Sequence, residues 1–262
     1  MMAVDAPALE TAADHLKAAL KNGGNIVVFT GAGVSKESGI PTFRDAQTGL
    51  WASYDPQDLA TREGFTQNPK LVWDWYDSRR NTVWDTTPNP AHQAIAELET
   101  LIETSYPTCG FTLITQNIDN LHRRAGSKAV LELHGNIFRY KCLNYGHPYS
   151  PELMPDLGEH RPPKCPHQNC NSDIRPDVVW FGEMLPTQTL EQAFTAAQEA
   201  TVMLVVGTSG VVHPAASLPV VANEAGAVLI EVNPEPSELS LIMDCYLQGP
   251  AGKILPTLMT EN

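Results

Sequence analysis

Long hydrophobic runs are absent from this chain of 262 residues. Its longest apolar stretches, such as VMLVVG and AVLI, have the length of strands, whereas a membrane-spanning helix needs about 20 apolar residues. With 42% hydrophobic and 18% charged residues, the chain can still bury a full core. We therefore expect a globular, soluble protein with no membrane partner.

Positive charge is also scarce, since 17 Lys and Arg residues face 30 Asp and Glu residues, a formal net charge of -13. Affinity for a nucleic-acid backbone comes from clustered Lys and Arg, so we expect no nucleic-acid partner. A local basic partner, such as a lysine-bearing peptide, is more compatible with this negative charge than a nucleic acid is. The stretch before the first buried run has no Arg and carries acidic residues before its lysines, unlike a secretory signal or an Arg-rich transit peptide. We expect a cytoplasmic protein, with mitochondrial or nuclear placement left open.

An even number of cysteines is lacking as well, because the chain has five, and it shows no secretory signal. An odd number in this context disfavours a disulfide framework and favours a metal site or free thiols. Three of the five lie in the segment 136–178, which is rich in Pro, Gly and His and has almost no periodicity. We expect this segment to be a small irregular insert held by a clip.

Short apolar runs alternate with helical patterns along the rest of the chain. This alternation predicts a Rossmann-like α/β fold with a parallel sheet covered on both faces. Residues 50–88 look helical and carry four of the five tryptophans, so they could form a second lobe over the mouth of the sheet. We expect a single domain, 1–262, with inserted modules at about 50–90 and 136–178. The predicted strands are 25–30, 111–115, 202–207 and 227–232, and the predicted helices are 8–21, 91–104 and 187–199.

The first strand runs into the loop TGAGVS. In open α/β sheets ligands bind beyond the carboxyl ends of the strands. Gly31 and Gly33 would let the backbone approach a pyrophosphate at the start of a helix. The third glycine of the dehydrogenase pattern is missing, because position 36 is Lys. On this loop alone, nucleotide binding and a tight strand-to-helix turn both remain open.

Polar side chains follow the second strand at the same edge. Gln116, Asn117 and Asp119 lie in TQNID, and LELHGN supplies His134 between apolar residues and a glycine. Two amides, a carboxylate and an imidazole at one edge predict a proton-handling site. His134 taken alone would more often be a structural histidine.

Five motifs at family-like spacing resemble the sirtuin family of NAD-dependent protein lysine deacylases. They are GAGVSKESGIPTFRD, TQNIDNLHRRAG, LELHG, VVWFGE and VVGTSGVVHPAA, and the similarity runs in order from about residue 24 to residue 256. In sirtuins this loop holds NAD as a substrate that is cleaved at its nicotinamide bond. The resemblance therefore explains why the dehydrogenase glycine is not required.

The resemblance implies an NAD site in which Arg44 binds phosphate and Phe43 shields the nicotinamide side. Asn117 and Asp119 would hold nicotinamide and ribose, and both would act in catalysis with His134. The residues implied to bind NAD are Gly31, Ala32, Gly33, Ser35, Phe43, Arg44, Gln116, Asn117, Ile118, Asp119, Gly207, Thr208, Ser209, Asn233, Pro234, Glu235 and Ala251.

In the family's reaction the acyl-amide oxygen attacks the ribose carbon as nicotinamide leaves, and a histidine then takes a proton from a ribose hydroxyl. His134 would be that base, and nicotinamide would inhibit as a product. The acyl-lysine protein or peptide would add as a strand against VVWFGE, a mode in which backbone bonds give affinity. The residues implied for this contact are Val179, Trp180, Phe181 and Gly182.

The acyl preference is indicated by WDWYDSRR, where Tyr76 and Arg79 lie three residues apart and so on one helical face. The same pair resembles the class III branch, which removes succinyl, malonyl and glutaryl groups. An arginine and a phenol would bind the distal carboxylate by charge-assisted hydrogen bonds. The alternative is a solvated Arg79 beside a core Tyr76. One departure is that FRDAQTGLW is a residue longer than in that branch.

Sirtuins generally hold the cysteine module with four zinc thiolates. Cys142, Cys165 and Cys170 match three of them, but the expected fourth position is Tyr145. His147 is near enough in sequence to complete a Cys3His zinc site. The alternative is an insert that folds without metal. We expect His160 and His167 to be exposed loop residues.

Three other functions remain open from the sequence. A deacetylase would keep the same chemistry with a neutral acyl group, and a mono-ADP-ribosyltransferase would use another nucleophile. A non-catalytic NAD-binding module is disfavoured because Asn117, Asp119 and His134 are all present.

Overall fold

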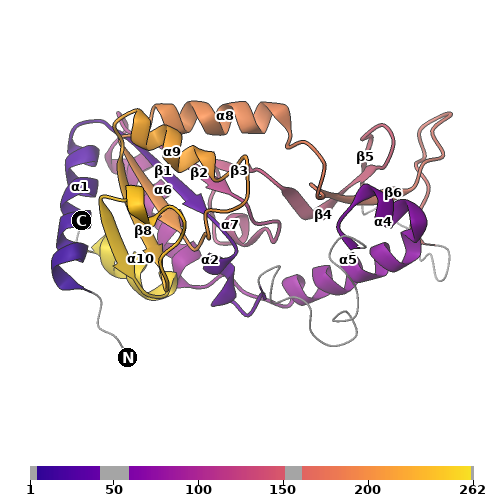
Figure 1. Cartoon of the computed structure of the whole chain (residues 1–262), viewed down its shortest axis with the longest axis horizontal. Coiled ribbons are helices and arrows are strands. Elements are labelled where there is room, and N and C mark those ends of the chain that lie inside the picture. The colour runs from indigo at the N-terminus through magenta and orange to yellow at the C-terminus, as the bar shows by residue number, and fades with distance from the viewer. Residues whose placement is uncertain (1–4, 42–58, 151–160, 261–262) are drawn as a thin grey trace.

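The computed structural model describes residues 5–41, 59–150 and 161–260. Its main sheet has six parallel strands in the order β3-β2-β1-β7-β8-β9 (Figure 1). The predicted α/β fold with a parallel sheet is confirmed, and the four predicted strands are found within one or two residues of their expected bounds. The strands are β1 (Asn25–Thr30), β2 (Gly110–Thr115), β3 (Val130–Glu132), β7 (Val202–Val206), β8 (Val228–Asn233) and β9 (Cys245–Gln248).

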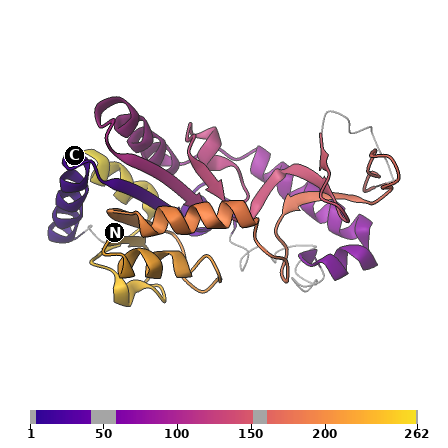
Figure 2. The ribbon, with the colours of Figure 1, turned by 90° about the horizontal axis from the view of Figure 1, so that it is seen from above.

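Helices cover both faces of this sheet (Figures 1 and 2). On one face the even residues of β1 pack with α1, α6 and α10 in one apolar cluster, and on the other face its odd residues pack with α8 and α9. Each predicted helix is found. The bounds are α1 (Ala6–Lys21), α6 (Pro90–Ser105), α8 (Thr187–Gln198), α9 (Ser217–Glu224) and α10 (Ala251–Thr260).

A smaller module lies at the end of the molecule far from both termini (Figure 1). It contains an antiparallel sheet in the order β5-β4-β6 and two helices that pack beside it. The helical prediction for 50–88 is confirmed for the residues described. The elements are α4 (Arg62–Gln67), α5 (Pro69–Trp84), β4 (Gly135–Cys142), β5 (Pro148–Tyr149) and β6 (Ile174–Val178).

The small insert expected at 136–178 contains regular strands although its sequence shows almost no periodicity, since β4 alone is eight residues long. Its pairing with β6 is interrupted between Asn136 and Tyr140 by a shift of register. An interrupted ladder breaks the alternation of apolar and polar residues that reveals a strand in the sequence. No helix within the described ranges is both long enough and apolar enough to cross a membrane.

Candidate active site

The loops that follow β1 and β7 contact each other through their backbones. The Gly31 N–H donates to Val206 O at 3.0 Å, and the Gly33 N–H donates to Gly207 O at 2.8 Å. A Cβ atom at Gly33 would lie 2.7 Å from that same Gly207 oxygen, and Gly207 itself has φ +60°. The glycines are therefore required by this close approach of two loops. Their contact brings two predicted NAD loops to one edge of the sheet.

Three predicted site residues form one buried hydrogen-bonded group. Ser35, the third residue of the short helix α2 (Gly33–Lys36), donates its hydroxyl hydrogen to Asp119 Oδ2 at 2.7 Å. The Asn117 amide donates to Ser35 Oγ at 3.1 Å and to Gly31 O at 3.0 Å. Burial raises the pKa of Asp119, while hydrogen bonds from the Leu121 N–H and from Ser35 lower it. The structure thus ties the loop after β1 to the loop after β2.

A second layer of buried polar residues lies beneath this group and was missed from the sequence. Asn89 begins α6, and its backbone N–H donates to His92 Nδ1 at 3.3 Å. The His92 Nε2 therefore carries the proton and contacts Ser35 Oγ at 3.4 Å. The rings of His92 and His122 lie 4.8 Å apart. The capping sequence Asn-Pro-Ala-His was the available signal, and burial lowers the pKa of both histidines, that of His92 to about 4.

His134 precedes β4 and is anchored at both its ring and its backbone. Its Nδ1 lies 2.8 Å from Gln116 O, so Nδ1 carries the proton and Nε2 is the free basic nitrogen. Its carbonyl accepts from the Val179 N–H at 2.9 Å. Burial lowers the pKa of His134, and the bond to Gln116 partly opposes that shift. The imidazole is therefore neutral near pH 7 with Nε2 available as a proton acceptor.

The remaining predicted NAD residues fall into two groups. Gln116 Nε2 donates to Thr208 Oγ1 at 3.0 Å, and Asn233 Nδ2 donates to Thr208 O at 2.9 Å, so the loops after β2, β7 and β8 are linked. The second group forms no hydrogen bond to these side chains among the described residues. It comprises exposed Ala32, Ser209, Pro234 and Glu235, half-buried Ile118, and buried Ala251 at the start of α10. Phe43 and Arg44 lie outside the described residues.

Tyr76 and Arg79 differ in their contacts. The Tyr76 oxygen accepts from the Trp180 Nε1–H at 2.9 Å, and burial raises the pKa of Tyr76 to about 12. The Arg79 guanidinium lies 5.0 Å from the centroid of the Trp75 ring. Among the described residues, Arg79 forms no hydrogen bond and no ion pair. Burial lowers its pKa, and the charges of Tyr76 and Asp119 partly oppose that shift. The phenol and the guanidinium interact electrostatically, so they share one region.

The predicted peptide-binding stretch leaves the small sheet and crosses toward α8. β6 ends at Val178, after which the Val179 N–H reaches His134 and the Phe181 N–H donates to Ala60 O at 2.9 Å. Trp180 is buried, whereas Phe181 is 54% exposed and Gly182 turns the chain with φ +82°. The stretch thus lies next to His134 at Val179, while the backbone of Phe181 is paired with the segment at Ala60 and Thr61.

Three cysteines and a histidine converge in the small module. The ligand atoms of Cys142, His147, Cys165 and Cys170 all lie within 4.8 Å of one another. His147 Nδ1 is 3.5 Å from the sulfurs of Cys142 and Cys165, and the sulfurs of Cys142 and Cys170 are 3.8 Å apart. Four ligands about 2.0–2.3 Å from a tetrahedral zinc ion would show similar separations. Tyr145 does not take the fourth position, since its ring is 69% exposed and stacks on His147.

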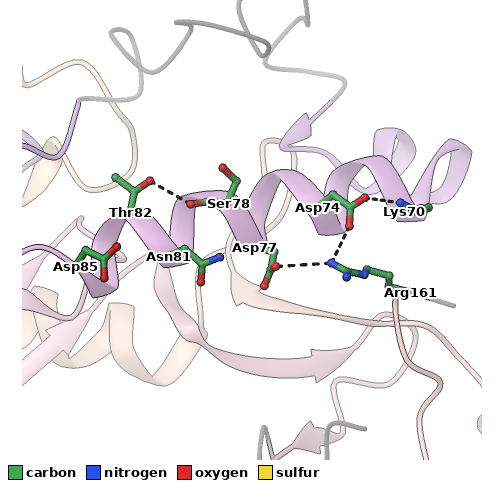
Figure 3. Close-up of a pocket in the computed structure, with 8 residues that line it drawn as sticks. All are labelled: Lys70, Asp74, Asp77, Ser78, Asn81, Thr82, Asp85 and Arg161. Atoms are coloured by element: carbon green, nitrogen blue, oxygen red, sulfur yellow. Dashed lines mark hydrogen bonds and ion pairs between the residues drawn. The ribbon is translucent and has the colours of Figure 1, made fainter. Parts of the chain in front are cut away.

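A separate polar hollow lies along the outer side of α5 (Figure 3). Arg161 bridges Asp74 and Asp77 there, at 3.3 and 3.7 Å, and Lys70 pairs with Asp74. None of the residues predicted for the site lines it. Figure 3 shows that two of the hollow's carboxylates, Asp74 and Asp77, already face cations of the same surface.

The Sir2 family model matches residues 31–214, which is more than half of the chain. The chain belongs to the Sir2 family. A relative from Pyrococcus furiosus, named NAD-dependent protein deacylase, is 49% identical over 238 residues, or 90% of this chain and 92% of that relative. A solved complex of a Sir2 homologue with NAD is 44% identical, with TM-score 0.81 and coverage of 93% and 92%. A Sir2 homologue bound to a myristoylated histone peptide is 37% identical, with TM-score 0.73 and coverage of 97% and 96%. The resemblance read from the sequence is confirmed.

Proposed function

We propose that this protein is an NAD-dependent protein-lysine deacylase whose catalytic base is His134. The observation that carries the proposal is the double anchoring of His134. Gln116 O fixes the protonated Nδ1 of the ring, and the Val179 N–H holds the backbone carbonyl. The basic Nε2 therefore has a fixed position between the loop after β2 and the start of the peptide-binding stretch. A base placed there can take a proton from a sugar hydroxyl while an acyl-lysine lies alongside.

The residues at the sheet edge fit NAD as the second substrate. Gly31 and Gly33 place no side chains where the loops after β1 and β7 meet. Thr208 and Asn233 add polar groups at the ends of β7 and β8, along the same edge of the sheet. When bound, NAD supplies an electrophilic ribose carbon as its bond to nicotinamide breaks. Buried Asn117 and Asp119 are held by Ser35, so they can orient the sugar and the amide of nicotinamide without rearranging. Nicotinamide, the leaving group, is the expected product inhibitor.

Tyr76 and Arg79 are the proposed determinants of an acidic acyl preference. The Tyr76 hydroxyl accepts from Trp180, and its own hydrogen has no acceptor among the described residues. Asp119 acts on the half-buried Arg79 guanidinium only through its charge, so a carboxylate on the ligand would add a direct hydrogen-bonded partner. A succinyl, malonyl or glutaryl chain would supply that carboxylate, and acetyl would not.

The small module is proposed to hold a structural zinc ion through Cys142, His147, Cys165 and Cys170. Thiolates and imidazole are ligands that zinc prefers, and four protein ligands close the coordination sphere. The ion would stabilise the fold of the module, and no step of the reaction is assigned to it. The single catalytic domain and the cytoplasmic location stay predictions from the sequence.

The test is a comparison of kcat/KM for succinyl-, malonyl- and acetyl-lysine forms of one peptide, each with and without NAD. NAD-dependent release of nicotinamide with faster turnover of the acidic acyl groups is expected. Turnover of acetyl-lysine alone would keep the deacylase and remove the role of Arg79 in recognition. No NAD-dependent turnover of any of the three would contradict the proposed function.

A further inference from the structure

A buried arginine that takes no part in the proposed reaction lies directly beneath the acyl-binding aromatic residues. Arg175, on β6, is 1% exposed, and its guanidinium carbon lies 3.2 Å from the centroid of the Trp180 ring. The guanidinium also donates to Val178 O at 2.7 Å. A planar cation held against an aromatic face fixes both the depth and the tilt of the ring.

Glu183, which follows the turn at Gly182, binds both Arg175 and the backbone of Trp180. Both of its carboxylate oxygens accept from the Arg175 guanidinium, a paired geometry that also fixes the plane of the group. The same Oε2 accepts from the Trp180 backbone N–H at 2.9 Å. The ring and the backbone of Trp180 are thus held by one ion pair.

The fixed indole acts on Tyr76. Trp180 Nε1–H donates to the Tyr76 oxygen at 2.9 Å, and Phe65 packs on the indole with ring centroids 5.3 Å apart. A phenol hydrogen prefers the plane of its ring, where only two directions are open to it. An indole N–H that occupies one of these directions leaves the hydroxyl hydrogen to point along the other. The direction in which Tyr76 donates is therefore set by the placement of Trp180.

We propose that Arg175 and Glu183 are positioning residues for acyl recognition: they hold Trp180 so that it aims the Tyr76 hydroxyl at the carboxylate of an acidic acyl chain. The inference rests on the proposed function and extends it to residues that do not touch the acyl group. The region contains no other cation that stacks on Trp180 among the described residues, so Arg175 has no substitute.

The test measures KM and kcat for succinyl- and acetyl-lysine peptides in Arg175→Lys and in Trp180→Phe. Lysine keeps the charge near Glu183 but loses the planar stack and the paired bonds, and Phe keeps a ring but removes the N–H donor. We expect the succinyl KM to rise about tenfold in Arg175→Lys, with the acetyl KM and both kcat values changed less than about twofold. In Trp180→Phe we expect the succinyl KM to rise more than the acetyl KM. A general loss of structure would instead lower both kcat values together.

Arg139→Lys is the matched control, because Arg139 also pairs with carboxylates in the same sheet but is exposed and contacts no aromatic residue of the acyl site. It should leave the succinyl-to-acetyl ratio at its wild-type value. If Arg175→Lys does not fold, Glu183→Gln takes its place, because it removes the charge of the ion pair and keeps the size of the side chain. An unchanged ratio in the folded variants would overturn the positioning role.

Tyr76→Phe separates this inference from the proposed function. If Tyr76→Phe raises the succinyl KM while Arg175→Lys and Trp180→Phe do not, only the positioning role is lost. If Tyr76→Phe also leaves the succinyl KM unchanged, the phenol does not bind the carboxylate and both proposals about the acyl end fail together.

Discussion

The two sheets of this molecule are stabilised in different ways. The parallel sheet relies on strands whose residues are apolar on both faces, and all five residues of β7 are buried. The small antiparallel sheet also packs in apolar clusters, but its β4 is mixed and buried cations take part in the packing. Arg80 lies 4.8 Å from the Tyr140 ring, and Arg175 stacks on Trp180. Both sheets therefore bury apolar area, and the second adds specific cation–aromatic contacts and the Cys/His cluster.

The two parts of the molecule carry different groups of proposed site residues. The loops proposed to bind NAD follow strands of the large sheet, and their backbones contact each other closely at Gly33 and Gly207. Tyr76 and Trp180 come from the small module. His134 joins the two, because it ends the loop from the large sheet and its carbonyl bonds to Val179. Substitutions in the Cys/His cluster, at His134 and at Arg79 should therefore change stability, turnover and acyl preference, respectively.

The largest expected effect is the loss of the small module when its metal ligands are removed. Cys170→Ser should abolish zinc binding and unfold the module, since structural zinc contributes on the order of 10 kcal/mol in small zinc domains. Metal content by mass spectrometry and thermal unfolding would check this. Cys109→Ser is the control, because Cys109 lies on the large domain outside the cluster. A Cys170→Ser protein with wild-type stability would show that the module folds without metal.

The next largest effect is expected on turnover, at His134 between the two sheets. His134→Asn removes the proposed base while its side chain can still bond to Gln116, so turnover should fall by a factor on the order of 1,000. NAD affinity, measured by calorimetry, should change little, because the loops after β1 and β7 do not depend on His134. Full turnover in this variant would assign the base to another residue.

A smaller effect is expected in the acyl pocket. Arg79→Met should lower kcat/KM for succinyl-lysine by roughly 10- to 100-fold, the cost of one charge-assisted hydrogen-bonding partner, and should affect acetyl-lysine much less. Lys70→Met on the same helix is the matched control, because Lys70 is exposed and its ion pair in the described part of the chain is with Asp74. Equal losses on both peptides in Arg79→Met would remove its selective role.

The sequence predicts the large sheet well and the small one poorly, for a physical reason. β1 and β7 are continuous apolar runs, which are visible wherever a parallel sheet is buried on both faces. β4 carries Arg139 and Lys141 among its apolar residues and has an irregular register, so its strand character depends on partners far away in the chain.

The site shows the same contrast. Motifs identified Ser35, Asn117, Asp119 and His134 by resemblance. The layer beneath them, with His92 and His122, comes from separate helices that only the fold brings together. The fourth metal ligand was open in the sequence because Tyr145 stands where the family has a thiolate and His147 is only near that position. The fold brings the His147 ring to the three cysteines.

The last effect, and the smallest within any one pH unit near neutrality, is a pH dependence of stability in the part of the molecule that contains the large sheet. Burial keeps His92 and His122 neutral, and the pKa of His92 falls from 6.5 to about 4. The unfolded chain then binds more protons below pH 6.5, so the free energy of unfolding should fall as pH drops from 6.5 toward 4, by up to about 1.4 kcal/mol per pH unit for each histidine. The raised pKa of Asp119 acts in the opposite direction and reduces the net slope.

Urea unfolding of wild type and of His92→Gln at pH 7.0, 6.0 and 5.0 isolates the histidine contribution. The glutamine side chain can keep a hydrogen bond to Ser35 without taking up a proton, so the variant should lose less stability between pH 6.0 and 5.0 than wild type. Asp119 is present in both proteins, and its contribution cancels in the comparison. Parallel curves would mean that His92 does not couple folding to pH, and the acid sensitivity of the large domain would then have to come from His122.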